Sequence, residues 1–482
     1  MSCRPQILIC YAWVALLITG CASRAAVPVR ERSLTAQENA WLAKAYRCEK
    51  NGWIYLHIEG APFERGFQRG YLTANEIDGF FKTLRHTEKF ETAQDLDYFV
   101  RQSAKLFRGK VSQEYVEEIQ GMAAGMRARG KGVTFNEMLF LNGFIDVSWY
   151  WWPKKKEAMG PGCSAFVATG EATADGGIVM AHNTWSDYVT GSFCNIIVDL
   201  VPDKGHRILM QSCGPAIYST TDFFITSAGL VGTETTIGGF KGFDARGTPV
   251  FERARKAMQY ADTIDEWARI MVEHNSGAYA NSWLLGDIKT NEIACLELGL
   301  KHHSLVKKKT GYLYGSNVTD DIQILRNETK DASYEDIRDC CVARRERWKQ
   351  LMKEYHGKID VESAKRMLAD HYDVYLEKEN PSHRTICGHC ELDAGRIPGD
   401  SLSAYYPSGA LDGKVVDSQM AQKWQIWAKW GSSCDRSFSA KEFLAKRTQY
   451  DWMEGYLKDL PAEPWTVFPP EGKPSSATGK IR

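Results

Sequence analysis

The chain has 482 residues, of which 44% are hydrophobic and 25% charged, a balance typical of a folded globular protein rather than a disordered one. Lysine and arginine together number 60, as do aspartate and glutamate, so the formal net charge is zero. Nucleic-acid-binding proteins usually carry a basic excess, so this balance argues against that class and predicts no nucleic-acid partner.

The first 21 residues have the pattern of an export signal. Arg4 gives a positive start, and residues 7–19 form an almost unbroken apolar run. Such a run is short for a membrane span but suits the core of a signal peptide. It ends in Ile-Thr-Gly-Cys at residues 18–21, which is similar to a bacterial lipobox and would make Cys21 a lipid tether to the membrane. A plain secretory peptide is the alternative. We therefore expect an exported protein, periplasmic or an outer-membrane lipoprotein if bacterial, and otherwise secreted or lysosomal.

Residues 22–162 are expected to form a helical pro-segment and a linker. Ser112 can cap a helix that stops near Gly130, and Thr134 and Glu137 have the spacing of a capping box. The stretch 149–162 then combines aromatic residues with Pro, Gly and the lysines at 154–156. That composition predicts an exposed connector, which is a natural place for proteolytic processing.

From Cys163 onward the pattern changes to strands. Residues 163–169 and 178–182 are predicted strands on either side of an Ala-Asp-Gly-Gly turn. Blocks of strands alternate with blocks of helices, which predicts layered α+β packing rather than βαβ units. We expect one domain over residues 163–482, with a loose tail from Glu471. Further strands are predicted at 195–201, 207–212, 222–236, 282–287 and 292–298, and helices after Pro249, from Thr263 and over 333–355.

Cys163 follows Pro-Gly at this change of pattern. If the bond to Gly162 were cut, the new α-amine would lie beside the thiol of the same residue. Its reference pKa is about 7.7–8.0, so it could accept the thiol proton near neutral pH. One residue would then supply both nucleophile and base. A buried cysteine that merely begins a strand is the alternative that the local sequence leaves open.

The chain carries a series of short motifs at residues 163–166, 181–188, 221–224, 227–231, 234–237, 275–283, 409–415 and 431–435. In order along the chain, these motifs resemble those of the phospholipase B-like family. The resemblance implies an N-terminal-nucleophile (Ntn) hydrolase, which is a four-layer αββα sandwich, here preceded by the helical pro-segment, that cleaves itself between Gly162 and Cys163. The isopenicillin N acyltransferase-like group is a second relative, through residues 247–270 and 385–389. That group usually carries an aspartate near Thr184-Trp185, so its layout transfers less directly.

The resemblance also implies a set of catalytic residues. Cys163 would be the nucleophile, and His182 would orient the amine or bind the substrate carbonyl. Asn281 would donate a hydrogen bond to the oxyanion. Arg384 would be a charged partner of the reacting acyl group, with a surface salt bridge as the alternative. The residues expected to bind or support the substrate are Trp185, Tyr188, Glu234 and Thr235.

The expected function is hydrolysis of an acyl ester or amide, including phospholipid, through a thioester at Cys163. The alternatives are an acyltransferase or small-amide hydrolase, and a non-catalytic lipid-binding lipoprotein that stays uncleaved. No cofactor is expected. No metal is expected either, because Cys387 and Cys390 supply only two of the four ligands that zinc needs, with His389 badly placed between them. A disulfide or packed thiols fit that motif better.

Overall fold

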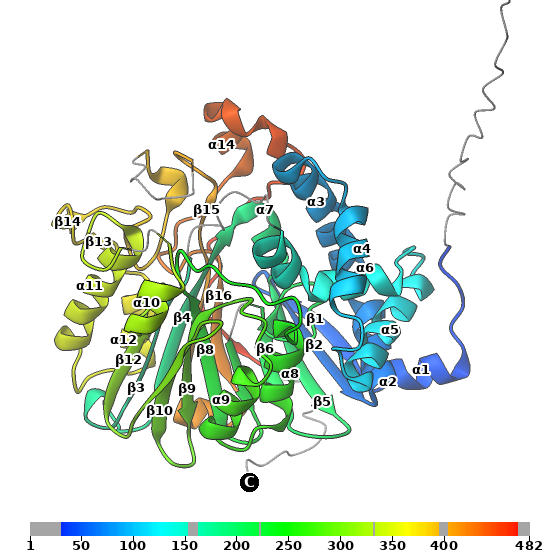
Figure 1. The fold of residues 1–482 in the computed structure, drawn as a ribbon, viewed down its shortest axis with the longest axis horizontal. Helices are drawn as coiled ribbons and strands as arrows, with labels where there is room; N and C mark the ends of the chain where they lie inside the picture. The colour runs from blue at the N-terminus through cyan, green and yellow to red at the C-terminus, as the bar shows by residue number, and fades with distance from the viewer. Residues whose placement is uncertain (1–29, 153–161, 221–222, 331–332, 395–402, 471–482) are drawn as a thin grey trace, which may run out of the picture.

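The computed structural model describes residues 30–152, 162–220, 223–330, 333–394 and 403–470. Within these ranges two β-sheets lie face to face, with helices against both outer faces (Figure 1). The layer order is therefore αββα, and the predicted α+β sandwich is confirmed. No helix in this part of the chain combines the length and the apolar character that a membrane crossing requires.

The larger sheet has nine strands and the smaller has six, and neighbours are antiparallel except for one parallel pair, β2 and β5. A separate two-stranded ribbon joins β13 (Tyr372–Asp373) and β14 (Lys378–Glu379). In spatial order the large sheet contains β1 (Tyr46–Lys50), β2 (Trp53–Gly60), β5 (Ile196–Pro202), β6 (Ile208–Ser212), β7 (Phe223–Thr226), β8 (Leu230–Thr236), β9 (Asn281–Asp287), β10 (Glu292–Leu298) and β11 (His303–Lys308). The small sheet contains β12 (Gly311–Gly315), β3 (Ser164–Thr169), β4 (Val179–Asp187), β15 (Ser408–Asp417), β16 (Ile426–Trp430) and β17 (Thr466–Phe468).

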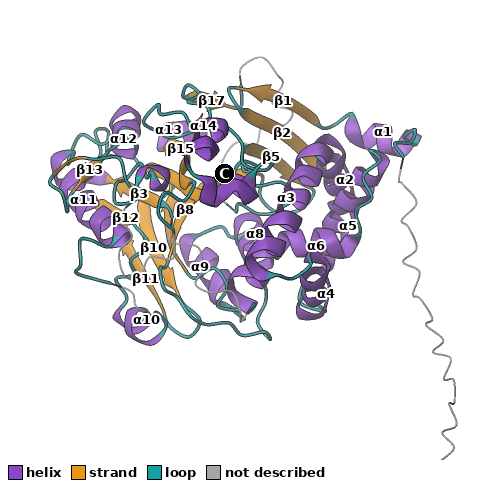
Figure 2. Cartoon of the chain, turned by 90° about the horizontal axis from the view of Figure 1, so that it is seen from above, coloured by secondary structure: helices purple, strands orange, loops and turns teal. Residues whose placement is uncertain are grey.

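Two groups of helices cover the outer faces of the sheets (Figures 1 and 2). The large sheet is covered by α2 (Pro62–Leu72), α3 (Ala74–Thr92), α4 (Leu96–Leu106), α5 (Gln113–Ala128), α6 (Phe135–Asn142), α8 (Val250–Tyr260) and α9 (Ile264–Val272). The small sheet is covered by α11 (Cys340–Glu354) and α12 (Val361–Leu368). Shorter helices are α1 (Ala36–Leu42), α7 (Tyr188–Gly191), α10 (Ile322–Asn327), α13 (Ser418–Gln422) and α14 (Ala440–Lys446), and Ile145–Trp151 forms a π-helical turn.

The core between the sheets determines which way the site residues face. Side chains alternate along a strand, and Ala165 and Val167 of β3 point into the inter-sheet core, whereas Phe166 packs against α11 and α12. On β4, Met180 points inward and Ala181 outward. By the same alternation, Cys163 and His182 belong to the inward-facing sets, between the two sheets.

The segment before Cys163 is mostly helical, as predicted, but it also contributes two strands that the sequence analysis missed. β1 and β2 form an antiparallel hairpin around Asn51 and Gly52, both of which have positive φ. β2 then pairs in parallel with β5, from Ile54 opposite Ile196 to Gly60 opposite Pro202. Residues 22–162 therefore complete the larger sheet in addition to forming helices.

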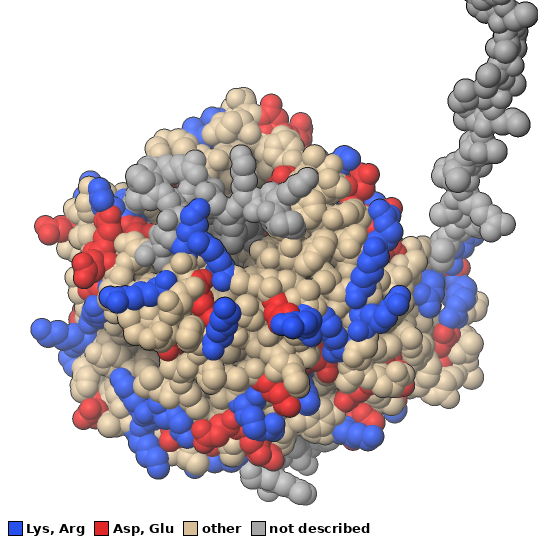
Figure 3. Space-filling view, viewed as in Figure 1, with Lys and Arg blue, Asp and Glu red and all other residues tan. Residues whose placement is uncertain are grey.

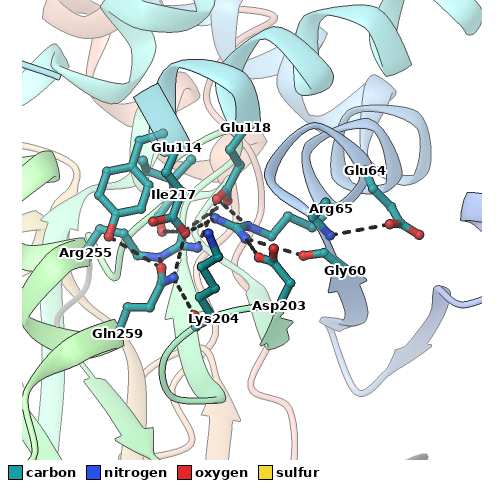
Figure 4. A network of polar contacts seen from close by, with 12 residues as sticks. Gly60, Glu64, Arg65, Glu114, Glu118, Asp203, Lys204, Ile217, Arg255 and Gln259 are labelled. Carbon is teal, nitrogen blue, oxygen red and sulfur yellow. Dashed lines mark hydrogen bonds and ion pairs between the residues drawn. The ribbon is translucent and has the colours of Figure 1, made fainter. Parts of the chain in front are cut away.

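Buried ion pairs also join this segment to the rest of the molecule (Figure 4). Glu118 on α5 lies 2.6 Å from Nε of Arg65 on α2 and 2.9 Å from Nη2 of Arg255 on α8, and all three side chains are buried. Burial alone would raise the pKa of Glu118, but the two guanidinium groups hold it below its usual value. Glu114 and Gln259 extend the network toward solvent.

We expect Glu118→Gln to lower the free energy of unfolding by about 3–5 kcal/mol, because it leaves buried guanidinium groups without their carboxylate. Urea unfolding followed by circular dichroism measures the change. The control is Glu117→Gln on the same helix, whose carboxylate contacts only Gln113 at an exposed position among the hydrogen bonds of the described residues. A loss below about 1 kcal/mol in Glu118→Gln would show that the network does not bind the segments together.

Other predicted elements match closely, with two differences. The strand predicted at 222–236 is a hairpin, β7 and β8, because Gly229 turns the chain with positive φ. The helix predicted from residue 333 begins at Cys340, because the Asp339 side chain caps it by accepting hydrogen bonds from the backbone amides of Cys341 and Val342. The tail from Glu471, like the signal, Cys21 and the lysines at 154–156, lies outside the described residues. On the face shown in Figure 3, acidic and basic side chains are interspersed.

Candidate active site

A buried trio of titratable side chains lies between the sheets at the head of β3. Sγ of Cys163, an imidazole nitrogen of His182 and a carboxylate oxygen of Glu234 all lie within 4.8 Å of one another. The β3–β4 hairpin brings the first two together, since Ala165 pairs with His182. Glu234 comes from β8 in the opposite sheet. The structure thus joins Cys163 and His182, as expected, and adds Glu234 as their direct neighbour.

His182 is held as a neutral imidazole. Complete burial lowers its pKa well below the ordinary value, and the charge of Lys414 on the paired strand lowers it further. Both ring nitrogens are buried without a hydrogen bond of ordinary geometry. A neutral imidazole can accept or donate one hydrogen bond at each nitrogen, so His182 retains the capacity to bind an amine or a carbonyl group.

Lys414 belongs to a buried polar network that the sequence analysis did not assign to the site. Its ammonium lies 2.7 Å from Oδ1 of Asp412 and donates to Thr184 and Gln211. Gln211, on β6 of the large sheet, also donates to Oδ2 of Asp412 at 2.7 Å. The network therefore bridges the two sheets beside His182. Lys414 lies within the family motif at 409–415, which could have drawn attention to it. Its role depends on Gln211 of β6, about 200 residues away in the sequence, and local sequence does not reveal that contact.

Glu234 is positioned by Tyr279. The Tyr279 hydroxyl donates a hydrogen bond to Oε1 of Glu234 at 3.1 Å. The backbone of Tyr279 has a φ of 57°, in the left-handed region that non-glycine residues rarely adopt. Such conformations cost about 1–3 kcal/mol and concentrate at functional sites. Tyr279 lies within the family motif at 275–283, so this motif placed a supporting residue that the sequence analysis did not name.

Asn281 begins β9 opposite Thr236 of β8, and its side chain is completely buried. Both Nδ2 and Oδ1 lack a hydrogen-bond partner among the described residues. An unpaired buried amide destabilises the folded state, so its retention is typical of a group whose partner is a ligand or reaction intermediate. The neighbouring Thr235 has a buried, unpaired hydroxyl that lies against Gly315 of β12.

Arg344 on α11 is a site residue that sequence reasoning missed. It donates to the carbonyl oxygen of Cys163 at 2.5 Å and to Oγ of Ser164 at 3.1 Å. Its guanidinium carbon also lies 4.3 Å from the ring centroid of Trp185, and Nη2 donates to Asn317 at 2.9 Å. Arg344 therefore fixes the backbone of the proposed nucleophile. No motif marked it, because it stands in a long charged helix.

Two predicted site residues, Arg384 and Tyr188, make their described contacts elsewhere, and Trp185 contacts both the site and a neighbouring loop. Arg384 is paired with Asp373 at 2.8 Å, and no contact described for it reaches Cys163. The Tyr188 hydroxyl donates to Glu391 at 2.9 Å. The Trp185 ring packs against Gly388 and belongs to a small apolar cluster with Cys387 and Cys434. Its Cβ, in contrast, lies beside Gly162. These contacts indicate that Tyr188 and the Trp185 ring support the neighbouring loops.

A small cleft lies near this region. Trp149 on its wall lies 6.4 Å, between ring centroids, from Tyr279, which in turn contacts Glu234. Asp187 and Val189 line the cleft. Trp185 and Tyr188, which the sequence predicted to bind substrate, are not among its lining residues. The full lining is Thr87, Glu88, Glu91, Phe144, Trp149, Asp187, Val189, Thr190, Tyr406 and Trp452.

The αββα layers, with Cys163, His182 and Glu234 buried between the sheets, define an α+β sandwich protein with a candidate cysteine nucleophile. The family model described as Phospholipase B matches residues 47–324, more than half of the chain, and the chain belongs to this family. The family resemblance predicted from the motifs is therefore confirmed. The match begins at β1, in agreement with a sandwich that includes the segment before Cys163.

Individual relatives are distant. An uncharacterized protein of Archaeoglobus fulgidus is 24% identical over 367 residues, which are 68% of this chain and 60% of that protein. Putative phospholipase B-like 1 of Caenorhabditis elegans is 35% identical over 176 residues, 34% of this chain and 30% of the relative. Phospholipase-B 81 of Drysdalia coronoides is 23% identical over 480 residues, 79% of this chain and 80% of the relative. The chain thus spans 60% and 30% of the lengths of the first two.

Among solved structures, penicillin V acylase from Agrobacterium tumefaciens aligns with a TM-score of 0.32 and 14% identity, covering 56% of this chain and 83% of that one.

Proposed function

We propose that this protein is an exported cysteine hydrolase whose nucleophile, Cys163, is exposed as a new N-terminus by cleavage after Gly162. The observation that carries the proposal is the buried trio of Cys163, His182 and Glu234 within 4.8 Å, at the head of an inner strand. Membership in the phospholipase B family supports a hydrolase, and the unpaired amide of Asn281 supports an oxyanion site nearby.

Maturation requires no reagent except water. Sγ of Cys163 attacks the carbonyl carbon of Gly162, the C–N bond breaks, and the leaving nitrogen takes up a proton equivalent to the one lost by the thiol. The product is a thioester between Gly162 and Cys163 with an adjacent α-amine. Water hydrolyses the thioester, so that Gly162 leaves as a carboxylic acid and the thiol regains its proton. Arg344, bound to the Cys163 carbonyl oxygen, would hold that residue in place during the attack.

Cleavage at this point would not release the N-terminal part. The parallel pairing of β2 with β5 and the Glu118 network both cross the proposed cut, joining residues before 162 to residues after 163. We therefore expect the two polypeptides to co-purify and to separate only under denaturing conditions.

The same groups serve substrate turnover. The α-amine of Cys163 takes the thiol proton, the thiolate attacks the acyl carbonyl, and Asn281 donates a hydrogen bond to the oxyanion. The alcohol or amine leaves with the proton from the α-ammonium, which produces a thioester at Cys163. Water, deprotonated by the same amine, then releases the acid. His182, neutral and unpaired, would orient the amine or the substrate carbonyl.

The substrate is an acyl ester or amide, including phospholipid, and the cleft near Tyr279 is the proposed entrance. Its aromatic residues Phe144, Trp149 and Trp452 suit an acyl chain. We propose export through residues 1–21, with Cys21 as a lipid tether. The disulfide between Cys194 and Cys213 supports an oxidising compartment.

The test compares two substrates that share one acyl chain, a phospholipid ester and the matching amide, on the mature protein. Free fatty acid is quantified, and the peptide beginning at Cys163 is examined by mass spectrometry for a bound acyl group. We expect acid release and an acyl adduct on Cys163. Transfer of the acyl group to an added amine in preference to water would identify an acyltransferase. Absence of acid, adduct and transfer with both substrates would contradict the proposal and favour a lipid-binding protein.

A further inference from the structure

A second cluster of ligand-type side chains lies outside the proposed active site. His371, Cys387, His389 and Cys434 each direct one donor atom to a common point, and the four atoms lie within 4.8 Å of one another. His371 directly precedes β13, Cys387 and His389 share the loop before Cys390–Leu392, and Cys434 follows β16. Three separate loops thus supply two sulfur and two nitrogen donors.

The distances within this cluster match those around a tetrahedral zinc ion. Zinc binds sulfur at about 2.3 Å and imidazole nitrogen at about 2.0–2.1 Å, so two ligands at a tetrahedral angle are separated by about 3.6 Å when one is sulfur and the other nitrogen. Nε2 of His389 lies 3.6 Å from Sγ of Cys387 and 3.3 Å from Sγ of Cys434. A four-donor set of two thiolates and two imidazoles is typical of zinc or an iron–sulfur centre, and for a single ion it is the donor set of structural zinc sites.

The surroundings orient the donors toward the common point. Nδ1 of His389 lies 2.9 Å from Oε1 of Glu391, whose other oxygen accepts the Tyr188 hydroxyl at 2.9 Å. This contact turns Nε2 of His389 toward the sulfurs, as the carboxylate partner of a zinc-bound histidine does. Nε2 of His371 is buried and has no hydrogen-bond partner of ordinary geometry in the described part of the chain. Cys387 is completely buried, so its sulfur is held in one position.

We propose that His371, Cys387, His389 and Cys434 form a structural Zn²⁺ site. The two thiols release their protons to solvent on binding, and the four protein ligands close the coordination shell, which leaves no open position for catalysis. The site fastens the loop of Gly388, on which Trp185 packs, to the loop after β16. The prediction of no metal rested on one Cys-x-x-Cys pair, and the fold supplies the second pair of ligands from distant loops.

The site differs in kind from a disulfide between Cys387 and Cys434, which is the main competing structure for an exported protein. A disulfide removes two hydrogens from the thiols, leaves both imidazoles unligated and binds no metal. Zinc binding involves no oxidation, so both cysteines are recovered as thiols after chelation under denaturing conditions. Metal content and thiol content together therefore distinguish the two states.

The experiment uses the full chain without its signal, produced with added zinc, dialysed, and analysed by inductively coupled plasma mass spectrometry. We expect one equivalent of zinc per chain, and loss of at least about tenfold in zinc affinity in Glu391→Gln, which replaces the carboxylate beside His389 by an amide and leaves an oxygen that can still accept the Tyr188 hydroxyl. Cys434→Ala is expected to lose the zinc, whereas Cys163→Ala and Cys295→Ala, which remove other thiols, are expected to retain it.

Cobalt substitution of the wild-type protein provides a second measurement that does not depend on a variant that folds. Tetrahedral Co²⁺ bound by two thiolates gives intense visible absorption and a sulfur-to-metal charge-transfer band, both reversed by zinc. Zinc below about one tenth of an equivalent, with no cobalt spectrum after chelation and reduction, would overturn the proposal. Recovery of a peptide pair cross-linked between Cys387 and Cys434 from the untreated protein would assign the cluster to a disulfide instead.

Discussion

Cys163→Ala is expected to abolish acid release from both ester and amide substrates, down to the rate of the buffer. The residue supplies the attacking sulfur and, once cleaved, the amine that activates it, so no neighbouring group can replace it. Removal of a nucleophile that acts as a unit with its base can lower kcat by a factor of about 10⁶. The rate of fatty acid release per folded chain, measured with the mature wild type as reference, checks the expectation.

A second thiol variant controls for the loss of a buried sulfur. Cys295→Ala removes a thiol from β10, whose pKa burial raises well above its ordinary value and which belongs to neither donor cluster. It is expected to hydrolyse substrate at the wild-type rate. Equal activity in Cys163→Ala and wild type would exclude Cys163 as the nucleophile.

Asn281→Ala is expected to lower kcat by about 10²–10³, which corresponds to one oxyanion donor worth about 2.7–4 kcal/mol. KM should change little, because the hydrogen bond strengthens as negative charge develops on the carbonyl oxygen. The free energy of unfolding should fall less than for a typical buried polar residue, since neither polar atom of Asn281 has a hydrogen-bond partner among the residues that the structure describes.

The combination of a large kinetic effect with a small effect on stability separates a catalytic role from a structural one. Asn39→Ala is the control, because its amide makes only an exposed contact, with the Thr35 carbonyl, among the hydrogen bonds of the described residues. If Asn281→Ala instead destabilises the protein strongly while kcat of the folded fraction is unchanged, Asn281 is a structural residue and the oxyanion donor lies elsewhere.

The strands that follow Cys163 could be predicted from the sequence because they are short, mainly apolar runs bounded by turn residues. The β1–β2 hairpin could also have been found, since Asn51-Gly52 is a strong signal for a two-residue turn between strands. It was missed because the surrounding helices dominate the pattern of residues 22–162. Its place beside β5 is a long-range pairing that local periodicity does not encode.

The candidate site could be predicted only where its residues lie in local motifs. Cys163 and His182 share one hairpin, so their proximity follows from a turn. Arg344 reaches Cys163 from 181 positions away along the chain, and its helix carries no distinguishing pattern. Arg384 shows the opposite case. Its position in a motif suggested a catalytic cation, but in the structure its guanidinium forms an ion pair with Asp373.

The donor cluster around His389 illustrates the same limit for metals. The local spacing of Cys387 and Cys390 argues for two ligands at most, but the structure uses Cys387 with Cys434, and His389 with His371. Strand β15 brings these segments together, because the backbone of Gly409 pairs with His389. Such a set is a property of the tertiary fold rather than of sequence spacing.

The most direct test of the central claim is the N-terminal sequence and intact mass of the protein expressed without its signal. For the wild type we predict two chains that co-purify, the C-terminal one beginning at Cys163, and for Cys163→Ala a single uncut chain. A wild-type chain that remains uncut at neutral and at acidic pH, or one cut equally in Cys163→Ala, would contradict self-cleavage by this cysteine.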